Sequence, residues 1–149
     1  MEYEIGKTGR VVVMRLHEKD PIYASIEGVA AAERIASAAV WIVGGVQNAT
    51  VVAGPRKQDV FPLETMDRHI DDAHEIVGFG TIFTDDSGRP KLHLHAAMGR
   101  GDTVIAGCPR KGADCWLVDE VIMLEITDTK ARRAKDGQTG LDLLTVKYP

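Results

Sequence analysis

The sequence has few of the residues that define several protein classes. Aromatic residues make up only 5% of the 149 residues, so the core must be built mainly from Val, Ile, Leu and Ala. Cys108 and Cys115 are the only cysteines, which excludes a disulfide framework. No apolar run approaches the roughly 18 residues of a membrane span. The first residues lack the basic and apolar regions of a secretory signal, so we expect a cytoplasmic protein with no membrane partner.

The composition that remains is that of one globular domain over residues 1–149. Apolar residues account for 44% and charged residues for 27% of the chain, which excludes a disordered protein. The length allows one compact domain and is too short for two ordinary ones. The net charge of −4 works against broad nonspecific attraction to nucleic acid.

One amphipathic helix is predicted over residues 21–37, after a β-branched first strand at 9–17. Asp20 has the residue type of an N-cap, and Pro21 suits the first helical position. Apolar side chains then recur at near-helical spacing in one stripe, which consists of Ile22, Ile26, Val29, Ala30 and Ile35.

The rest of the chain is rich in strand signals. We predict strands at 38–43, 48–54, 74–83, 91–98, 103–106, 116–127 and 141–148, with an irregular segment at 55–68. Residues 84–90 are dense in turn formers, so the strands on either side of them should form a hairpin. The predicted fold class is α+β, a mostly antiparallel sheet packed around one main helix.

Two histidines alternate with apolar residues in the second strand of that hairpin. Successive side chains of a strand point to opposite faces, so His93 and His95 should share one face. Two neutral imidazoles side by side can bind one metal ion. The motif alone is weak, because a half-buried strand can also carry two solvated histidines on its wet face.

Two further residues could complete a metal site around this pair. Cys108 lies at the end of a strand beside turn-forming residues, where it could supply a thiolate or act as a small buried hydrophobe. His74 opens the strand that should pair with the His-x-His strand, although it could equally be a solvated histidine at a strand start.

Glu120 is a candidate of another kind. On the strand 116–127 it alternates onto the same face as Trp116, Val118, Ile122 and Leu124. A carboxylate on an apolar face needs a partner, because an isolated buried charge is very costly. That partner could be a metal, a metal-bound imidazole N–H or an arginine, and we favour an arginine.

Two motifs resemble nucleic-acid-binding segments but have simpler explanations. Residues 87–91 contain the Gly-Arg-Pro core of an AT-hook, but they lie where the hairpin must turn. The basic cluster within 130–135 is flanked by Asp128 and Asp136 and is interpreted as a solvated linker. No residue pattern identifies a catalytic nucleophile.

The order of these segments resembles the plant and prokaryote conserved (PPC) domain family. The matching residues are 43–46 (Val-Gly-Gly-Val), 74–82, 92–100, Gly107-Cys108 and 120–122, and the His-x-His block with its trailing Gly-Arg is the most specific of them. Cys108 occupies the position where many relatives carry a histidine. Residues 73–76 read Ala-His-Glu-Ile, where plant relatives carry Arg-Phe-Glu-Ile.

The resemblance implies a homotrimer of single α+β domains, with histidine metal ligands near a subunit boundary in some prokaryotic members. Together with the residues above, it predicts a divalent metal, zinc first, bound by His93, His95 and Cys108, with His74 and Glu120 as supporting groups. A small molecule could occupy the open metal position. The alternatives are a DNA-binding regulatory protein, from the family's usual description, and a metal-dependent hydrolase or lyase.

Overall fold

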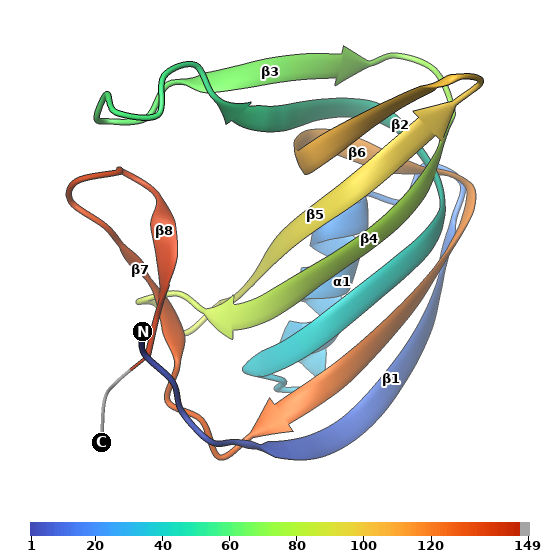
Figure 1. The fold of residues 1–149 in the computed structure, drawn as a ribbon. Coiled ribbons are helices and arrows are strands. Elements are labelled where there is room, and N and C mark those ends of the chain that lie inside the picture. Colours follow the sequence, from blue (N-terminus) through green and yellow to red (C-terminus); the bar gives the residue numbers. More distant parts are fainter. Residues whose placement is uncertain (147–149) are drawn as a thin grey trace.

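A strongly curved antiparallel sheet with one helix packed against it forms the body of the protein (Figure 1). The computed structural model describes residues 1–146. The elements in chain order are β1 (Lys7–His17), α1 (Ile22–Ala32), β2 (Ser37–Pro55), β3 (Thr65–Ile70), β4 (His74–Thr84), β5 (Pro90–Arg100), β6 (Thr103–Thr127), β7 (Arg132–Lys135) and β8 (Asp142–Thr145). The predicted α+β class with one main helix is confirmed.

The sheet has the strand order β1-β6-β5-β4-β2-β3, and β6 pairs with β2 as well. The first residues of β6 pair with β5, and its later residues pair with β2 and β1. Because β6 changes partners along its length, the sheet curls back on itself. The strands β7 and β8 form a separate hairpin.

The two faces of the sheet differ in what covers them. The inner face packs against α1 and carries buried side chains such as Ile42, Leu94 and Met123. Residues directly opposite one another in a ladder share a face. One row of the other face, called the outer face here, therefore runs across five strands and consists of Val13, Ile122, Trp41, Phe79 and His95. These side chains are exposed in the single chain.

The helix is shorter than predicted and begins differently. Pro21 is the N-cap and makes no side-chain capping bond. Asp20, predicted as the cap, instead accepts a hydrogen bond from the backbone N–H of His17 at 2.8 Å. The helix ends at Ala32 because Arg34 adopts a left-handed φ of 57°, and the N–H of Ile35 then bonds the carbonyl of Ala30. This is a Schellman motif without its usual glycine, which is why the sequence did not reveal it.

The boundaries of several strands also differ from those predicted. The segments predicted at 38–43 and 48–54 form the single strand β2, and those at 103–106 and 116–127 belong to β6. The pairing of β2 with β6 shifts register at 44–46 and at 50–51. Such bulges let a strand continue past residues, such as glycine and proline, that are typical of strand ends. The segment predicted as irregular, 55–68, includes the first four residues of β3, an edge strand whose mostly polar sequence lacks an apolar strand pattern. The predicted linker contains β7.

The hairpin of β4 and β5 is confirmed, with Thr84 opposite Pro90. Its turn is held by Asp85, whose carboxylate accepts bonds from the backbone N–H groups of Ser87 and Arg89. Residues 85–89 thus form the turn, and Pro90 and Lys91 of the Gly-Arg-Pro segment begin β5. The strand predicted at 141–148 corresponds to β8, and positions 147 and 148 of that prediction lie outside the described residues. Within the described part of the chain, no helix is both long and apolar enough to span a bilayer.

Candidate metal centre

The candidate site lies where β6 leaves β5. Ala96 of β5 is opposite Gly107, but the next residue of β6, Cys108, is opposite Val52 of β2. A side chain at Gly107 would place its Cβ 2.3 Å from the backbone oxygen of Val52, so the close approach requires glycine. This crossing brings Cys108 beside the edge of β5, just beyond the two histidines.

The structure brings His93, His95 and Cys108 together. Their ligand atoms all lie within 4.8 Å of one another, and the Nε2 atoms of the two histidines are 3.1 Å apart. Tetrahedral zinc, with Zn–N bonds of about 2.0 Å and a Zn–S bond of about 2.3 Å, would separate two nitrogens by about 3.3 Å and a nitrogen from a sulfur by about 3.6 Å. Small side-chain rotations therefore suffice to reach these distances, and the donor set fits a metal ion.

The three groups differ in burial, and Tyr23 contacts the buried one. Cys108 is buried at 4% exposure, while both histidines reach the surface. The hydroxyl oxygen of Tyr23, from α1, lies 3.7 Å from the Cys108 sulfur. Burial, reinforced by the nearby Cys108, raises the pKa of Tyr23, so its hydroxyl stays neutral and can donate to a thiolate.

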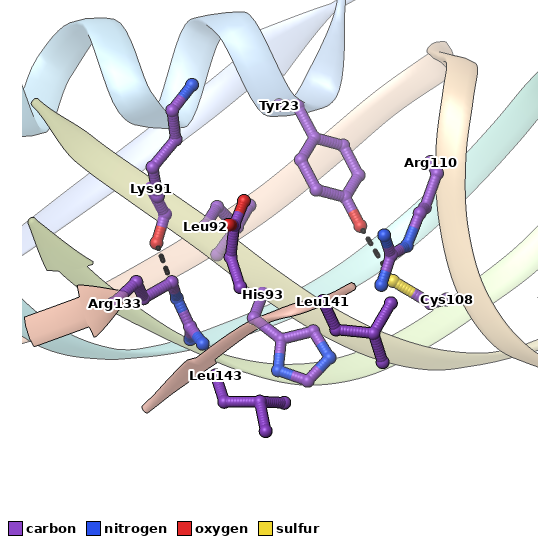
Figure 2. Close-up of a pocket in the computed structure, with 10 residues that line it drawn as sticks. Tyr23, Lys91, Leu92, His93, Cys108, Arg110, Arg133, Leu141 and Leu143 are labelled. Atoms are coloured by element: carbon purple, nitrogen blue, oxygen red, sulfur yellow. Dashed lines mark hydrogen bonds between the residues drawn. The ribbon is translucent and has the colours of Figure 1, made fainter. Parts of the chain in front are cut away.

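A pocket of about 220 Å³ opens beside His93 and Cys108 (Figure 2). Arg133 of β7 reaches it and donates hydrogen bonds to the Lys91 carbonyl at 3.4 Å and to the Thr81 hydroxyl at 2.9 Å. Burial lowers the pKa of His93 to about 4, and the positive charge of Arg133 acts in the same direction. His93 is therefore a neutral imidazole at pH 7, the form that binds metals.

His74 and Glu120 are not brought to this group within one chain. His74 lies at the far end of β4, opposite Val46, and its Nδ1 bonds the Asp72 carbonyl at 3.0 Å. Glu120 pairs with Val43 of β2, and β4 separates that strand from β5. Their supporting role stays a prediction that only a contact between copies of the chain could satisfy.

The buried carboxylate of β6 is Asp119 rather than Glu120. Glu120 does alternate with Ile122 and Leu124 as predicted, but that face is the outer face of the sheet, and Glu120 is exposed. Asp119 shares the inner face with Val121 and is fully buried. Alternation could not distinguish the faces, because both are apolar. The one signal for Asp119 was that alternation places it between Leu117 and Val121.

Neither carboxylate oxygen of Asp119 has a hydrogen-bond partner of normal geometry in the described part of the chain. Burial raises its pKa to about 6, although the neighbouring Cys115 thiol and Gly45 amide oppose the rise. Burial likewise raises the pKa of Cys115 to about 12. Below about pH 6 the pair is therefore a protonated acid beside a neutral thiol.

We expect Asp119 to contribute a stabilisation that is lost as the pH rises from 4 to 7. The native state holds the Asp119 proton up to about pH 6, whereas an unfolded carboxyl loses it near pH 3.8. This contribution to the free energy of unfolding should drop by on the order of 3 kcal/mol across the window, while the lowered pKa of His93 acts in the opposite direction over much of the same range. Asp119→Asn removes the contribution, so urea denaturation at each pH should show the stability of the wild type falling relative to that of the variant as the pH rises.

Glu120→Gln is the matched control, because it neutralises the adjacent exposed carboxylate. It should leave the pH profile close to that of the wild type. An Asp119→Asn protein with an unchanged profile would show that ionisation of Asp119 costs the fold nothing.

Residues 3–127 match the family model described as the Plants and Prokaryotes Conserved (PCC) domain. The match covers well over half of the chain. The chain therefore belongs to the Plants and Prokaryotes Conserved domain family. No curated protein among those compared matches the chain.

Two solved structures share the fold over nearly all of both chains. One is the metal-containing protein AF0104 from Archaeoglobus fulgidus, with a TM-score of 0.84, 23% identity, and coverage of 97% of this chain and 99% of that one. The other is a plant- and prokaryote-conserved protein from Pyrococcus horikoshii, with a TM-score of 0.84, 20% identity and full coverage of both chains. At these identities the likeness establishes the fold.

Proposed function

We propose that this protein binds one divalent transition-metal ion, zinc first, through the imidazoles of His93 and His95 and the thiolate of Cys108. The observation that carries the proposal is the convergence of these three ligand atoms within 4.8 Å from two different strands. A structural relative is itself described as metal-containing, which supports the proposal.

The ligand set suits the chemistry of zinc. Imidazole nitrogen and thiolate sulfur are its usual ligands, and three protein ligands leave the fourth tetrahedral position for water or a small molecule. A bound zinc would act there as a Lewis acid. The protein's own part is to hold His93 and His95 side by side on one face of β5 and to keep Cys108 buried beside Tyr23.

Metal content tests the proposal directly. Protein reconstituted with zinc and then dialysed should carry one metal ion per chain in native mass spectrometry. A variant with His93→Ala and His95→Ala should carry none, because one thiolate cannot hold the ion alone.

A matched control replaces the two histidines that lie elsewhere on exposed strand positions. His17→Ala with His69→Ala removes the same number of imidazoles and should retain the metal. A folded wild-type protein that stays metal-free after zinc reconstitution would refute the proposal.

We also propose that copies of this chain cover the outer face of the sheet, in the trimer that the family resemblance implies. Large apolar side chains gather there in adjacent strands: Val11, Val13, Trp41, Val43, Val77, Phe79 and Ile122. Contiguous apolar surface of this kind marks protein interfaces. His93 and His95 point to the same face, so assembly would bring a neighbouring copy close to the metal centre.

DNA binding and metal-dependent hydrolysis or lyase chemistry stay predictions. The net charge of −4 does not favour DNA. In the basic cluster of 130–135, Arg133 is buried and Arg132 pairs with Asp86, so two of its four cations are not presented at the surface as free charges for DNA.

A further inference from the structure

We propose that the pocket beside the metal centre binds a small organic oxyanion, with one oxygen in the open metal position and its charge facing Arg110 and Arg133. This inference rests on the proposed metal site and names the class of ligand that the site takes. Both guanidinium groups line the same pocket as His93 and Cys108 (Figure 2).

The first argument is positive charge that the chain compensates only in part. Arg133 is only 6% exposed, yet within the described residues neither it nor Arg110 has a carboxylate within 4.0 Å. A buried cation without a counter-ion is costly. Asp142 also lines the pocket and attracts Arg133 from a longer distance, so it offsets part of this charge.

The second argument is that Arg133 keeps a hydrogen-bond donor that no described residue uses, whereas another cation of the pocket, Lys91, is paired elsewhere. The Nε and Nη2 atoms of Arg133 donate to backbone and hydroxyl oxygens, while its Nη1 donates no hydrogen bond to any described residue. Lys91 differs, because its ammonium pairs with Glu27 at 3.8 Å and points away from His93 in Figure 2. The two arginines are therefore the available counter-charges.

The third argument is the metal itself. A divalent ion with one thiolate ligand keeps a net positive charge, and its open position accepts an oxygen donor. A ligand that reaches both the metal and a guanidinium must carry an anionic oxygen at short range, which a carboxylate or a phosphate supplies.

The remaining walls indicate an organic ligand of limited size. Leu92, Leu141 and Leu143 line the pocket together with the polar groups. Its volume of about 220 Å³ lies below the 300–1,000 Å³ of sites for drug-sized ligands. A short aliphatic acid or a small phosphate ester fits both conditions.

Part of the pocket comes from outside the family region. The family model ends at residue 127, whereas Arg133 belongs to β7 and Asp142 and Leu143 belong to β8. The hairpin of β7 and β8 would therefore determine which anion this protein accepts, while the metal ligands belong to the common domain.

Titration of the cobalt-substituted protein tests the inference, because the visible spectrum of bound cobalt reports a new ligand. We expect butyrate or glycerol phosphate to change the spectrum saturably, and isothermal titration calorimetry of the zinc form should give the affinity. The preferred probe distinguishes a carboxylate ligand from a phosphate one. Arg110→Gln should weaken binding about tenfold to hundredfold, through loss of a charged hydrogen bond.

Arg68→Gln is the control, because it removes an exposed arginine of β3 that does not line the pocket. Arg133→Gln should act like Arg110→Gln, and Arg133→Lys keeps a charge if the glutamine variant does not fold. Metal that loads normally while neither probe binds, or equal binding by the Arg110→Gln and Arg68→Gln proteins, would overturn this inference alone. Failure to load metal would instead overturn the proposed function.

Discussion

Trp41→Glu should convert the assembled protein to monomers. Trp41 is 43% exposed in the single chain and lies in the middle of the outer face, 5.4 Å from the ring centre of Phe79, which is 51% exposed. If copies of the chain cover this face, the glutamate would be an unpaired charge in an apolar interface. We expect the dissociation constant to rise at least hundredfold, as loss of a central aromatic contact alone costs 2 kcal/mol or more.

The measurement is the molar mass by light scattering at micromolar concentration. Phe61→Glu provides the control, since Phe61 is as exposed as Trp41 but lies in the segment between β2 and β3. The control should keep the mass of the wild type. A wild-type protein that is monomeric at tens of micromolar would rule out the assembly, and an unchanged mass of the Trp41→Glu protein would place its interface elsewhere.

Gly107→Ala should both destabilise the fold and weaken metal binding. The new Cβ would lie 2.3 Å from the Val52 backbone oxygen and 3.0 Å from a methyl group of Val51, so β6 must move away from β2. We expect the free energy of unfolding to fall by about 3 kcal/mol or more, as for other severe backbone clashes. Cys108 follows directly in β6, so zinc affinity should fall at least tenfold.

Gly99→Ala is the matched control in the neighbouring strand. Its Cβ would meet Val104 at 3.9 Å, which is an ordinary contact. Urea denaturation and competition with a zinc chelator should show the Gly99→Ala protein close to the wild type. If the Gly107→Ala protein were equally stable and bound zinc equally well, the crossing of β6 would not be what places the sulfur.

Local patterns in the sequence were sufficient for much of this fold. The hairpin of β4 and β5 follows from a dense turn signal between two strands, and the common face of His93 and His95 follows from the two-residue period of a strand. The helix follows from the spacing of Ile22, Ile26 and Ala30, all of which are buried. These features depend on residues a few positions apart, so their information is local.

The boundaries of the longest strands, β2 and β6, could not be predicted from local sequence patterns. Glycine and proline residues within β2 and β6 are typical of strand ends, but here they lie at bulges and bends inside continuous strands. Whether such a residue ends a strand depends on whether the partner strand continues beside it. That partner comes from a distant part of the chain.

The amino-acid sequence alone therefore determined the helix, the hairpin of β4 and β5, the paired histidines and the candidacy of Cys108. Only the tertiary structure decided that β6 crosses from β5 to β2 and brings the sulfur to the imidazoles, that Asp119 rather than Glu120 is buried, and that Arg133 reaches the pocket from β7. The physical reason is that side-chain alternation is a local property of a strand, whereas the face that is buried and the atoms that meet depend on which strands pair.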